Sequence, residues 1–167
     1  GNASRKGILI KGGIYLEELA RLTVLALDKT GTLTQGQPRV VEVIPAPGET
    51  EHTVLAAASV VEQRSEHPLA KAVMVRTRDL GLATPSAGDT FEALVGAGAQ
   101  ASADGHRYLV GSPALMEDRG LALNGLRDRV EQLETSGQTA IVTAVDDRVL
   151  GVIGIADVIR PQAVDAI

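Results

Sequence analysis

The sequence predicts an α/β chain in which an antiparallel α+β unit is inserted into a parallel-sheet domain. Six short apolar stretches rich in β-branched residues lie between positions 39 and 155, and two of their connections carry hairpin signals. Another apolar run, 23–27, ends directly in Asp28, and open α/β sheets bind their ligands at such strand ends. The segments before 34 and after 157 therefore read as two incomplete pieces of one parallel sheet, with the insert between them.

The N-terminal flank is predicted to contain a helix followed by a buried strand. Apolar residues at helical spacing predict the helix over 15–21, and the run 23–27 predicts the strand. In the loop that follows, Gly31 permits a tight turn, and the hydroxyl and backbone N–H groups suit a phosphate or another anion. Glycine and proline mark 35–38 as a hinge or linker.

The insert is predicted to form six strands, joined mostly as hairpins. The strands are expected at 39–44, 90–95, 99–103, 106–110, 139–145 and 149–155. Asp104-Gly105 and Asp146-Asp147-Arg148 are the two hairpin signals. A loop is expected at 84–88, between the helical part and the second strand.

Four helices are expected within the insert, and a last one begins at Arg160-Pro161. The insert helices are expected at 51–63, 69–80, 113–119 and 123–135. For the second of them, we expect Ser65 at the N-cap, Pro68 in the first turn and Gly81 at the C-terminal end. Together, these elements predict an antiparallel six-stranded sheet flanked by helices.

Composition excludes several classes of function. The chain has 167 residues, 44% of them hydrophobic but only 2% aromatic, so the core must be aliphatic. The net charge is −5 without a basic block, which argues against nucleic acid as a partner. There is no cysteine, and the three histidines are scattered. No apolar run approaches the roughly 18 residues of a membrane span and no signal peptide is visible, so we expect the chain as given to be soluble.

The stretch from Asp28 to Thr34 carries the most specific motif. Its sequence, Asp-Lys-Thr-Gly-Thr-Leu-Thr, resembles the phosphorylation motif of P-type ATPases, ion pumps built on a haloacid-dehalogenase-like Rossmann domain. The resemblance implies that Asp28 accepts the γ-phosphoryl group of ATP, with Lys29 and Thr30 in the same catalytic loop. It also implies that Asp28 and Thr30 hold Mg²⁺ in the complete phosphorylation domain. Related phosphatases carry a second Asp where this chain has Thr30, which cannot transfer protons near neutral pH, so the aspartyl-phosphate should persist longer.

A second motif, Ser65-Glu66-His67-Pro68-Leu69, resembles that of the heavy-metal-transporting branch of these pumps. The resemblance implies that His67 contacts the adenine ring of ATP, which an imidazole can both stack on and hydrogen-bond. It also implies that Glu62 accepts a hydrogen bond from the adenine amino group. The alternatives are a surface histidine at a helix start and an exposed helix carboxylate.

Three glycines complete the nucleotide site that the resemblance implies. Gly96-Ala97-Gly98 is similar to the family's Gly-x-Gly loop, where glycines let the backbone approach a nucleotide closely. Gly111 lies in a Val-Gly-Ser element where the family has Val-Gly-Asn. The serine, Ser112, favours zinc-, cadmium- or cobalt-type pumps over copper pumps.

The returning segment carries one further element of the family. Asp157-Val158-Ile159-Arg160-Pro161 resembles the Asp-x-x-Arg-Pro hinge, whose Asp and Arg approach the nucleotide phosphates in the family. Arginine suits phosphate because its guanidinium presents a planar donor fork. The alternative for Asp157 and Arg160 is a loop ion pair in front of a helix.

The resemblance implies three segments and a place in a larger protein. Residues 1–36 would be the N-terminal part of the phosphorylation domain, 37–156 the ATP-binding domain and 157–167 the truncated start of the returning segment. The parent would be a cation-transporting ATPase that works with ATP and Mg²⁺ at the cytoplasmic face of a bacterial plasma membrane. Its partners would be the membrane helices, the actuator domain, the remainder of the phosphorylation domain and the transported metal.

The family's Mg²⁺-binding loop does not occur in this sequence, so we expect weak nucleotide binding and little ATP turnover. Two other functions stay open at this point. One is a soluble haloacid-dehalogenase-type phosphatase with a cap insert. The other is a non-catalytic regulatory domain, which predicts no nucleotide binding.

Overall fold

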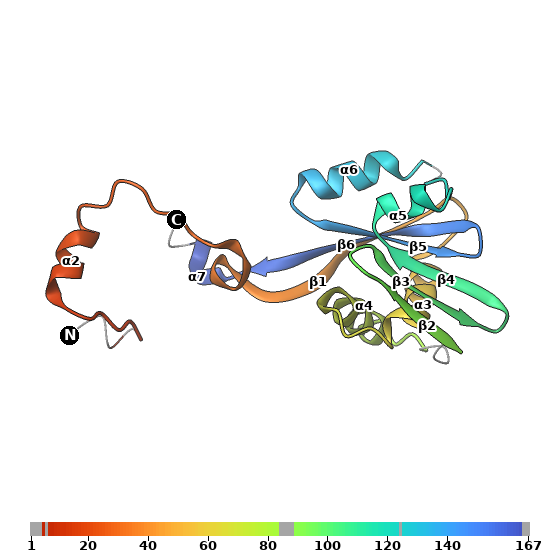
Figure 1. Cartoon of the computed structure of the whole chain (residues 1–167), viewed down its shortest axis with the longest axis horizontal. Coiled ribbons are helices and arrows are strands. Elements are labelled where there is room, and N and C mark those ends of the chain that lie inside the picture. Colours follow the sequence, from red (N-terminus) through yellow and green to blue (C-terminus); the bar gives the residue numbers. More distant parts are fainter. Residues whose placement is uncertain (1–4, 6, 84–88, 124, 165–167) are drawn as a thin grey trace.

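A single six-stranded antiparallel sheet organises the structure, a computed structural model that describes residues 5, 7–83, 89–123 and 125–164 (Figure 1). The strand order is β1-β6-β5-β4-β3-β2. The strands are β1 (Thr34–Pro45), β2 (Thr90–Leu94), β3 (Gly98–Ala103), β4 (His106–Gly111), β5 (Thr139–Val145) and β6 (Arg148–Ile159). All six predicted strands of the insert are confirmed, while the loop predicted at 84–88 lies outside the described residues.

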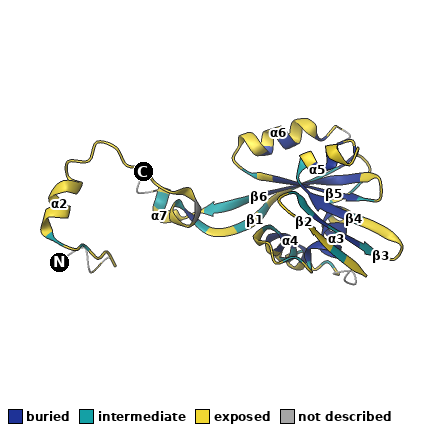
Figure 2. Ribbon diagram, viewed as in Figure 1, coloured by how far each residue is buried: buried dark blue, intermediate teal, exposed yellow. Residues whose placement is uncertain are grey.

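Helices cover both faces of this sheet (Figure 1). One face packs against α3 (Glu51–Glu62) and α4 (Pro68–Asp79), and the other against α5 (Pro113–Asp118) and α6 (Arg127–Thr135). The side chains of β5 alternate accordingly, with Ile141 in the first core and Val142 in the second. Figure 2 shows the buried residues concentrated in these layers, as the predicted helix-flanked sheet requires.

The two hairpin signals form as predicted. Asp104 (φ 51°) and Gly105 (φ 77°) link β3 to β4 in left-handed conformations, and Asp146 (φ 52°) begins the two-residue link from β5 to β6. Left-handed residues match the twist of such hairpins, and Asp and Gly tolerate that conformation best.

The strand predicted at 23–27 is wrong in this structure. Helix α2 (Gly13–Leu19) forms close to the predicted position, but 23–27 is irregular, with Val24 80% and Leu25 69% exposed. A strand needs a neighbour for its backbone N–H and C=O groups, and no described strand pairs with this run. The apolar pattern alone therefore does not make a strand.

The prediction of a hinge or linker at 35–38 is also wrong, because this segment belongs to β1. Strands β1 and β6 continue past the sheet as a two-stranded ribbon, which ends beside helix α7 (Pro161–Val164) and the short π-helical turn η1 (Lys29–Leu33) (Figure 1). The pairing shifts register between Thr34 and Pro38. Glycine and proline are accommodated there by an irregularity in an edge strand.

Two helix starts differ from the prediction. Helix α4 is capped by His67 instead of Ser65, although Pro68 does occupy its first turn and Gly81 (φ 65°) follows its end. Helix α6 begins at Arg127, four residues later than predicted, because Gly125 adopts a left-handed conformation (φ 81°) that a helix cannot continue through.

Candidate functional site

A pocket of about 450 Å³ lies at one end of the sheet and collects most of the predicted site. It is bounded by the C-terminal end of α3, the start of α4, the β2–β3 turn, the β4–α5 junction and the start of β5. Five predicted residues from separate stretches of the chain line it: Glu62, His67, Gly96, Gly98 and Gly111.

Glu62 is the buried acid of this pocket. It is the last residue of α3 and only 7% exposed, so the alternative of an exposed helix carboxylate is wrong. Burial raises the pKa of its carboxyl from the ordinary 4.5 to about 7, and a hydrogen bond with Ser65 offsets part of that rise. An ionised carboxylate here offers strong acceptors to a ligand that donates hydrogen bonds.

His67 caps a helix and also lines the pocket. Its Nδ1 accepts a hydrogen bond of 3.2 Å from the backbone N–H of Leu69 and so caps α4. Because a backbone N–H can only donate, Nδ1 is unprotonated and the neutral ring carries its proton on Nε2. The alternative of a surface histidine at a helix start is therefore confirmed, and the same exposed side chain also lines the pocket.

The three glycines are required for different reasons. Gly96 turns with φ 71°, and a Cβ there would meet nothing within 4 Å. A Cβ on Gly98 would collide with the backbone of Val110 and Gly111, and one on Gly111 would lie 2.5 Å from the carbonyl oxygen of Ala97. Gly98 and Gly111 therefore allow strands β3 and β4 to approach, whereas Gly96 leaves open space beside the pocket.

Sequence reasoning missed the apolar walls of the pocket. These come from Leu69, from the β2–β3 turn and from the first residues of β5: Leu69, Ala93, Leu94, Val95, Ala97, Thr139, Ala140 and Ile141. Leu69 belongs to the motif that contains His67 and could have been included. The start of β5 has no local signal, because the sheet brings it to the pocket by placing β5 between β4 and β6. Ser112 also lines the pocket, and its hydroxyl caps α5 by accepting from Leu115 N–H at 3.2 Å.

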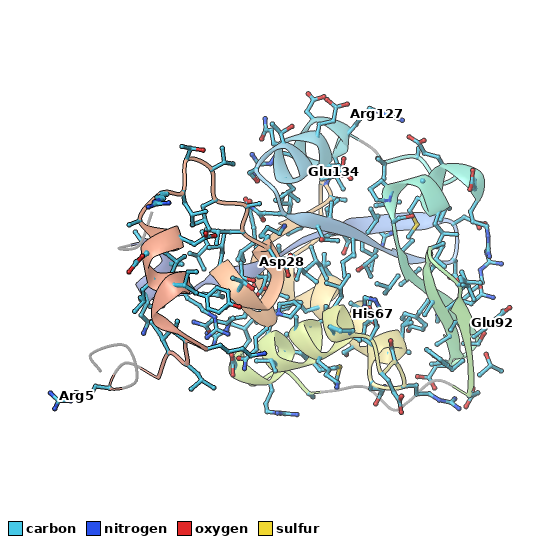
Figure 3. The ribbon with its side chains drawn as sticks, turned by 60° about the vertical axis from the view of Figure 1, so that its left-hand side comes forward. Arg5, Asp28, His67, Glu92, Arg127 and Glu134 are labelled. Atoms are coloured by element: carbon cyan, nitrogen blue, oxygen red, sulfur yellow. The ribbon has the colours of Figure 1, made fainter. Side chains whose placement is uncertain are left out.

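Asp28 lies apart from this pocket. It is exposed, precedes η1 and belongs to the N-terminal segment beyond the β1/β6 ribbon (Figures 1 and 3). Lys29, also exposed, follows it. Neither residue lines the pocket, so the structure gathers the predicted adenine-side residues but does not bring the predicted phosphoryl acceptor to them.

Asp157 and Arg160 also lie outside the pocket, at the far end of the ribbon. The carboxylate of Asp157 accepts from the backbone N–H groups of Gly36 (3.1 Å) and Gln37 (2.9 Å). The guanidinium of Arg160 donates to the carbonyl oxygens of Thr34 (2.8 Å) and Gly31 (3.2 Å). The alternative of an ion pair between Asp157 and Arg160 is wrong, because each binds the opposite strand and its loop.

The side chain of Asp28 is a suitable type of ligand for Mg²⁺, but the described residues offer too few such ligands together to form a complete site. The hard oxygen of Asp28 is a suitable ligand, since Mg²⁺ is usually held by one or two carboxylates together with substrate phosphates and water. Among the described residues, however, no cluster of three or more His, Cys, Asp or Glu side chains could hold a metal ion. Asp28 would therefore share a bound Mg²⁺ with ligands from elsewhere.

A second cleft, of about 720 Å³, runs between β1 and α4 and includes Arg39, Lys71 and Arg76. None of the predicted site residues lines it, so the smaller pocket is the candidate site. In the described part of the chain, no helix has the length and apolar character needed to cross a bilayer.

Comparison with known proteins agrees with these features. Residues 22–167 match the haloacid dehalogenase-like hydrolases. The chain is 44% identical over 165 residues to the zinc/cadmium/lead-transporting P-type ATPase of Escherichia coli (strain K12), covering 99% of this chain and 22% of that protein. It is 40% identical over 167 residues to the copper-exporting P-type ATPase of Bacillus subtilis (strain 168), covering 100% and 21%.

A solved structure shows the same arrangement. The crystal structure of a zinc-transporting PIB-type ATPase in the E2.Pi state superposes with a TM-score of 0.83 at 40% identity, covering 99% of this chain and 26% of that one. The chain thus spans about a fifth of the length of the curated relatives it matches. It belongs to the haloacid dehalogenase-like hydrolase family and is homologous to a segment of the heavy-metal P-type ATPases.

Proposed function

We propose that this chain is the ATP-binding and phosphorylated part of a heavy-metal cation-transporting P-type ATPase. Residues 37–156 would bind ATP, and the flanks 1–36 and 157–167 would belong to the phosphorylation domain. The Asp28 carboxylate would attack the γ-phosphorus of ATP, and the bond between the γ-phosphorus and the oxygen that bridges it to the β-phosphate would break. ADP would depart, and an aspartyl-phosphate would remain on Asp28. The site would work at the cytoplasmic face of a membrane, with the rest of the pump as its partner.

The observation that carries this proposal is the convergence of Glu62 and His67 in one pocket. The ionised carboxylate of Glu62 can accept from the exocyclic amino group of adenine, while His67 Nε2–H can donate to a ring nitrogen. The apolar walls offer the purine a dry surface, as small-molecule sites usually do. Gly96 leaves room at the mouth for the sugar and phosphates.

Phosphoryl transfer then requires the pocket to approach Asp28, which does not line it and belongs to the N-terminal segment beyond the ribbon (Figure 1). The β1/β6 ribbon joins the two regions, so a movement of this ribbon would deliver the γ-phosphate to the carboxylate. When bound, Mg²⁺ neutralises phosphate charge during transfer. Asp28 and Thr30 are the residues of this chain proposed to hold it.

The transported ion is proposed only as a heavy-metal cation. The relatives named above include zinc/cadmium/lead and copper transporters. Ser112 favours the zinc, cadmium and cobalt type over the copper type.

The soluble phosphatase and the regulatory domain are less well supported. The relatives are transporting ATPases, and Thr30 stands where a phosphatase needs a second acid. A regulatory domain gives no reason for a buried carboxylate without an ion-pair partner among the described residues.

The test is an ATP titration followed by backbone NMR, on the parent chain, His67→Ala and His67→Asn. The alanine variant also loses the α4 cap, which typically costs about 1 kcal/mol, whereas asparagine is a good N-cap and retains it. We expect ATP to shift the amides of Glu62, Gly96 and Gly111 in the parent, and both variants to lose this response. A folded parent whose amides do not respond to millimolar ATP would refute the proposal.

A further inference from the structure

The β1/β6 ribbon contains an irregularity at the point where it meets the Asp28 loop. Thr34 pairs with Ile159 and Pro38 with Asp157, so four steps along β1 correspond to two along β6. The residues between, Gln35 to Gln37, therefore leave the regular ladder. Their backbone N–H groups need other acceptors, because an unsatisfied backbone donor is costly.

Asp157 supplies acceptors for two of these groups, the N–H groups of Gly36 and Gln37, with its two carboxylate oxygens. Oδ2 accepts from Gly36 N–H at 3.1 Å and from the Thr34 hydroxyl, and Oδ1 accepts from Gln37 N–H at 2.9 Å. The hydrogen bond from Thr34, followed by those from the backbone, lowers the pKa of the Asp157 carboxyl. Thr34 is only 3% exposed, although it lies at the edge of an otherwise exposed segment.

Arg160 binds the same region of the chain. Its backbone N–H donates to the carbonyl of Leu33 at 2.8 Å, while its guanidinium donates to the carbonyls of Thr34 and Gly31. The Thr34 hydroxyl in turn accepts from Gly31 N–H at 3.1 Å. Arg160, which directly follows β6, therefore binds Gly31 and Leu33 in the loop after Asp28 and Thr34 at the start of β1.

We propose that Asp157 and Arg160 are positioning residues that clasp the Asp28 loop to the returning strand, and that they do not bind the nucleotide phosphates. This inference rests on the proposed function only in the role it gives to Asp28. We call the contacts of Asp157 and Arg160 with Gly31, Thr34, Gly36 and Gln37 the ribbon clasp.

Chemistry favours the clasp over a phosphate site. Both oxygens of Asp157 are already occupied by donors, and a carboxylate repels phosphate. The Nε and one terminal nitrogen of Arg160 donate to the backbone carbonyls of Thr34 and Gly31, so this pair of donors is not free to bind a phosphate in a bidentate manner. The clasp also makes the predicted hinge at 35–38 a fixed point of the ribbon.

The test uses the whole chain without nucleotide, comparing the parent with Asp157→Asn, Asp157→Glu and Arg160→Lys. Asparagine keeps the shape of the side chain but replaces one acceptor oxygen with a donor. We expect amide hydrogen exchange at Gly31, Gly36 and Gln37 to accelerate at least tenfold in Asp157→Asn, with Gly96 and Gly111 unchanged. Asp147→Asn, which alters an exposed hairpin carboxylate, is the matched control and should change none of these amides.

A pH titration supplies a signature that a general loss of stability does not mimic. In the parent, the amide proton shifts of Gly36 and Gln37 should change together as the Asp157 carboxylate protonates, below the usual range for aspartate. That common inflection should vanish in Asp157→Asn and return, at an altered pH, in Asp157→Glu. Unchanged exchange and an unchanged inflection in Asp157→Asn would overturn the clasp.

A nucleotide titration separates the clasp from the family expectation. We expect the ATP affinity of Asp157→Asn and Arg160→Lys to stay within about twofold of the parent. A tenfold loss for ATP but not for adenosine would mean that these residues contact phosphates, and would overturn the proposal. If the parent binds no ATP, the proposed function fails, while the exchange and pH experiments still decide the clasp.

Discussion

Replacing Glu62 by glutamine tests the electrostatics of the pocket most directly. The carboxyl is 7% exposed, and its pKa is raised from 4.5 to about 7 because burial penalises the charged form. The difference between these two pKa values corresponds to about 3 kcal/mol, at about 1.4 kcal/mol per pKa unit. This is an upper value for the free energy that the folded protein loses when Glu62 ionises. Glutamine has nearly the same shape and carries no charge at any pH.

The sign of the effect follows from proton binding. Between pH 4.5 and 7 the folded parent holds a proton on Glu62 that the unfolded chain has released, so its stability falls as pH rises through this window. Above pH 7 both states are ionised and the full cost is present. The stability of Glu62→Gln relative to the parent should therefore increase by up to about 2.5 kcal/mol from pH 5 to pH 8, since a small part of the cost is already present at pH 5.

Urea denaturation at pH 5 and pH 8 measures this difference. Glu66→Gln is the matched control, because Glu66 is a nearby but exposed carboxylate, and its relative stability should change by less than about 0.5 kcal/mol. The same glutamine should weaken ATP binding at pH 8, because an amide is a poorer acceptor for the adenine amino group. A relative stability of Glu62→Gln that is equal at both pH values would refute the assignment of Glu62 as a desolvated pocket acid.

The remaining predictions concern the glycines, the pH dependence of binding and the activity of the chain. Gly98→Ala should destabilise the fold by about 1–3 kcal/mol, because its Cβ would collide with β4, whereas Gly96→Ala should cost about 1 kcal/mol because of its left-handed backbone alone. Thermal unfolding measures both losses of stability. Equal losses would contradict the different roles of the two glycines. ATP affinity should fall about tenfold between pH 8 and pH 6, as only about a tenth of Glu62 stays ionised, and calorimetric titration should find no such fall in Glu62→Gln. The chain should turn over little or no ATP in a phosphate-release assay with Mg²⁺; vigorous turnover abolished by Asp28→Asn would show that the described residues suffice for catalysis.

Local signals in the sequence determined most of the insert. The Asp104-Gly105 and Asp146-Asp147 turns require left-handed residues, and these occur at the observed turns. Pro68 and Gly81 mark the ends of α4, and the strands follow their apolar alternation. These features depend on residues a few positions apart, so a pattern in the sequence is enough to predict them.

The site was predicted only in part. The motifs indicated His67 and Glu62, but only the fold brings these two residues together with Gly96 and Gly111 in one pocket. The sequence also could not separate the roles of the glycines, since the contacts of Gly98 and Gly111 arise from the pairing of β3 with β4.

The tertiary structure alone decided what happens at the two flanks. The apolar run 23–27 is a strand by pattern, yet it forms none because no described strand pairs with it. The segment 35–38 is a linker by composition, yet Asp157, at least 120 positions later, accepts hydrogen bonds from its Gly36 and Gln37 and holds it in a ribbon. Sequence patterns report the preference of a segment for its own neighbours, whereas backbone hydrogen bonds between distant segments depend on which partner the fold supplies.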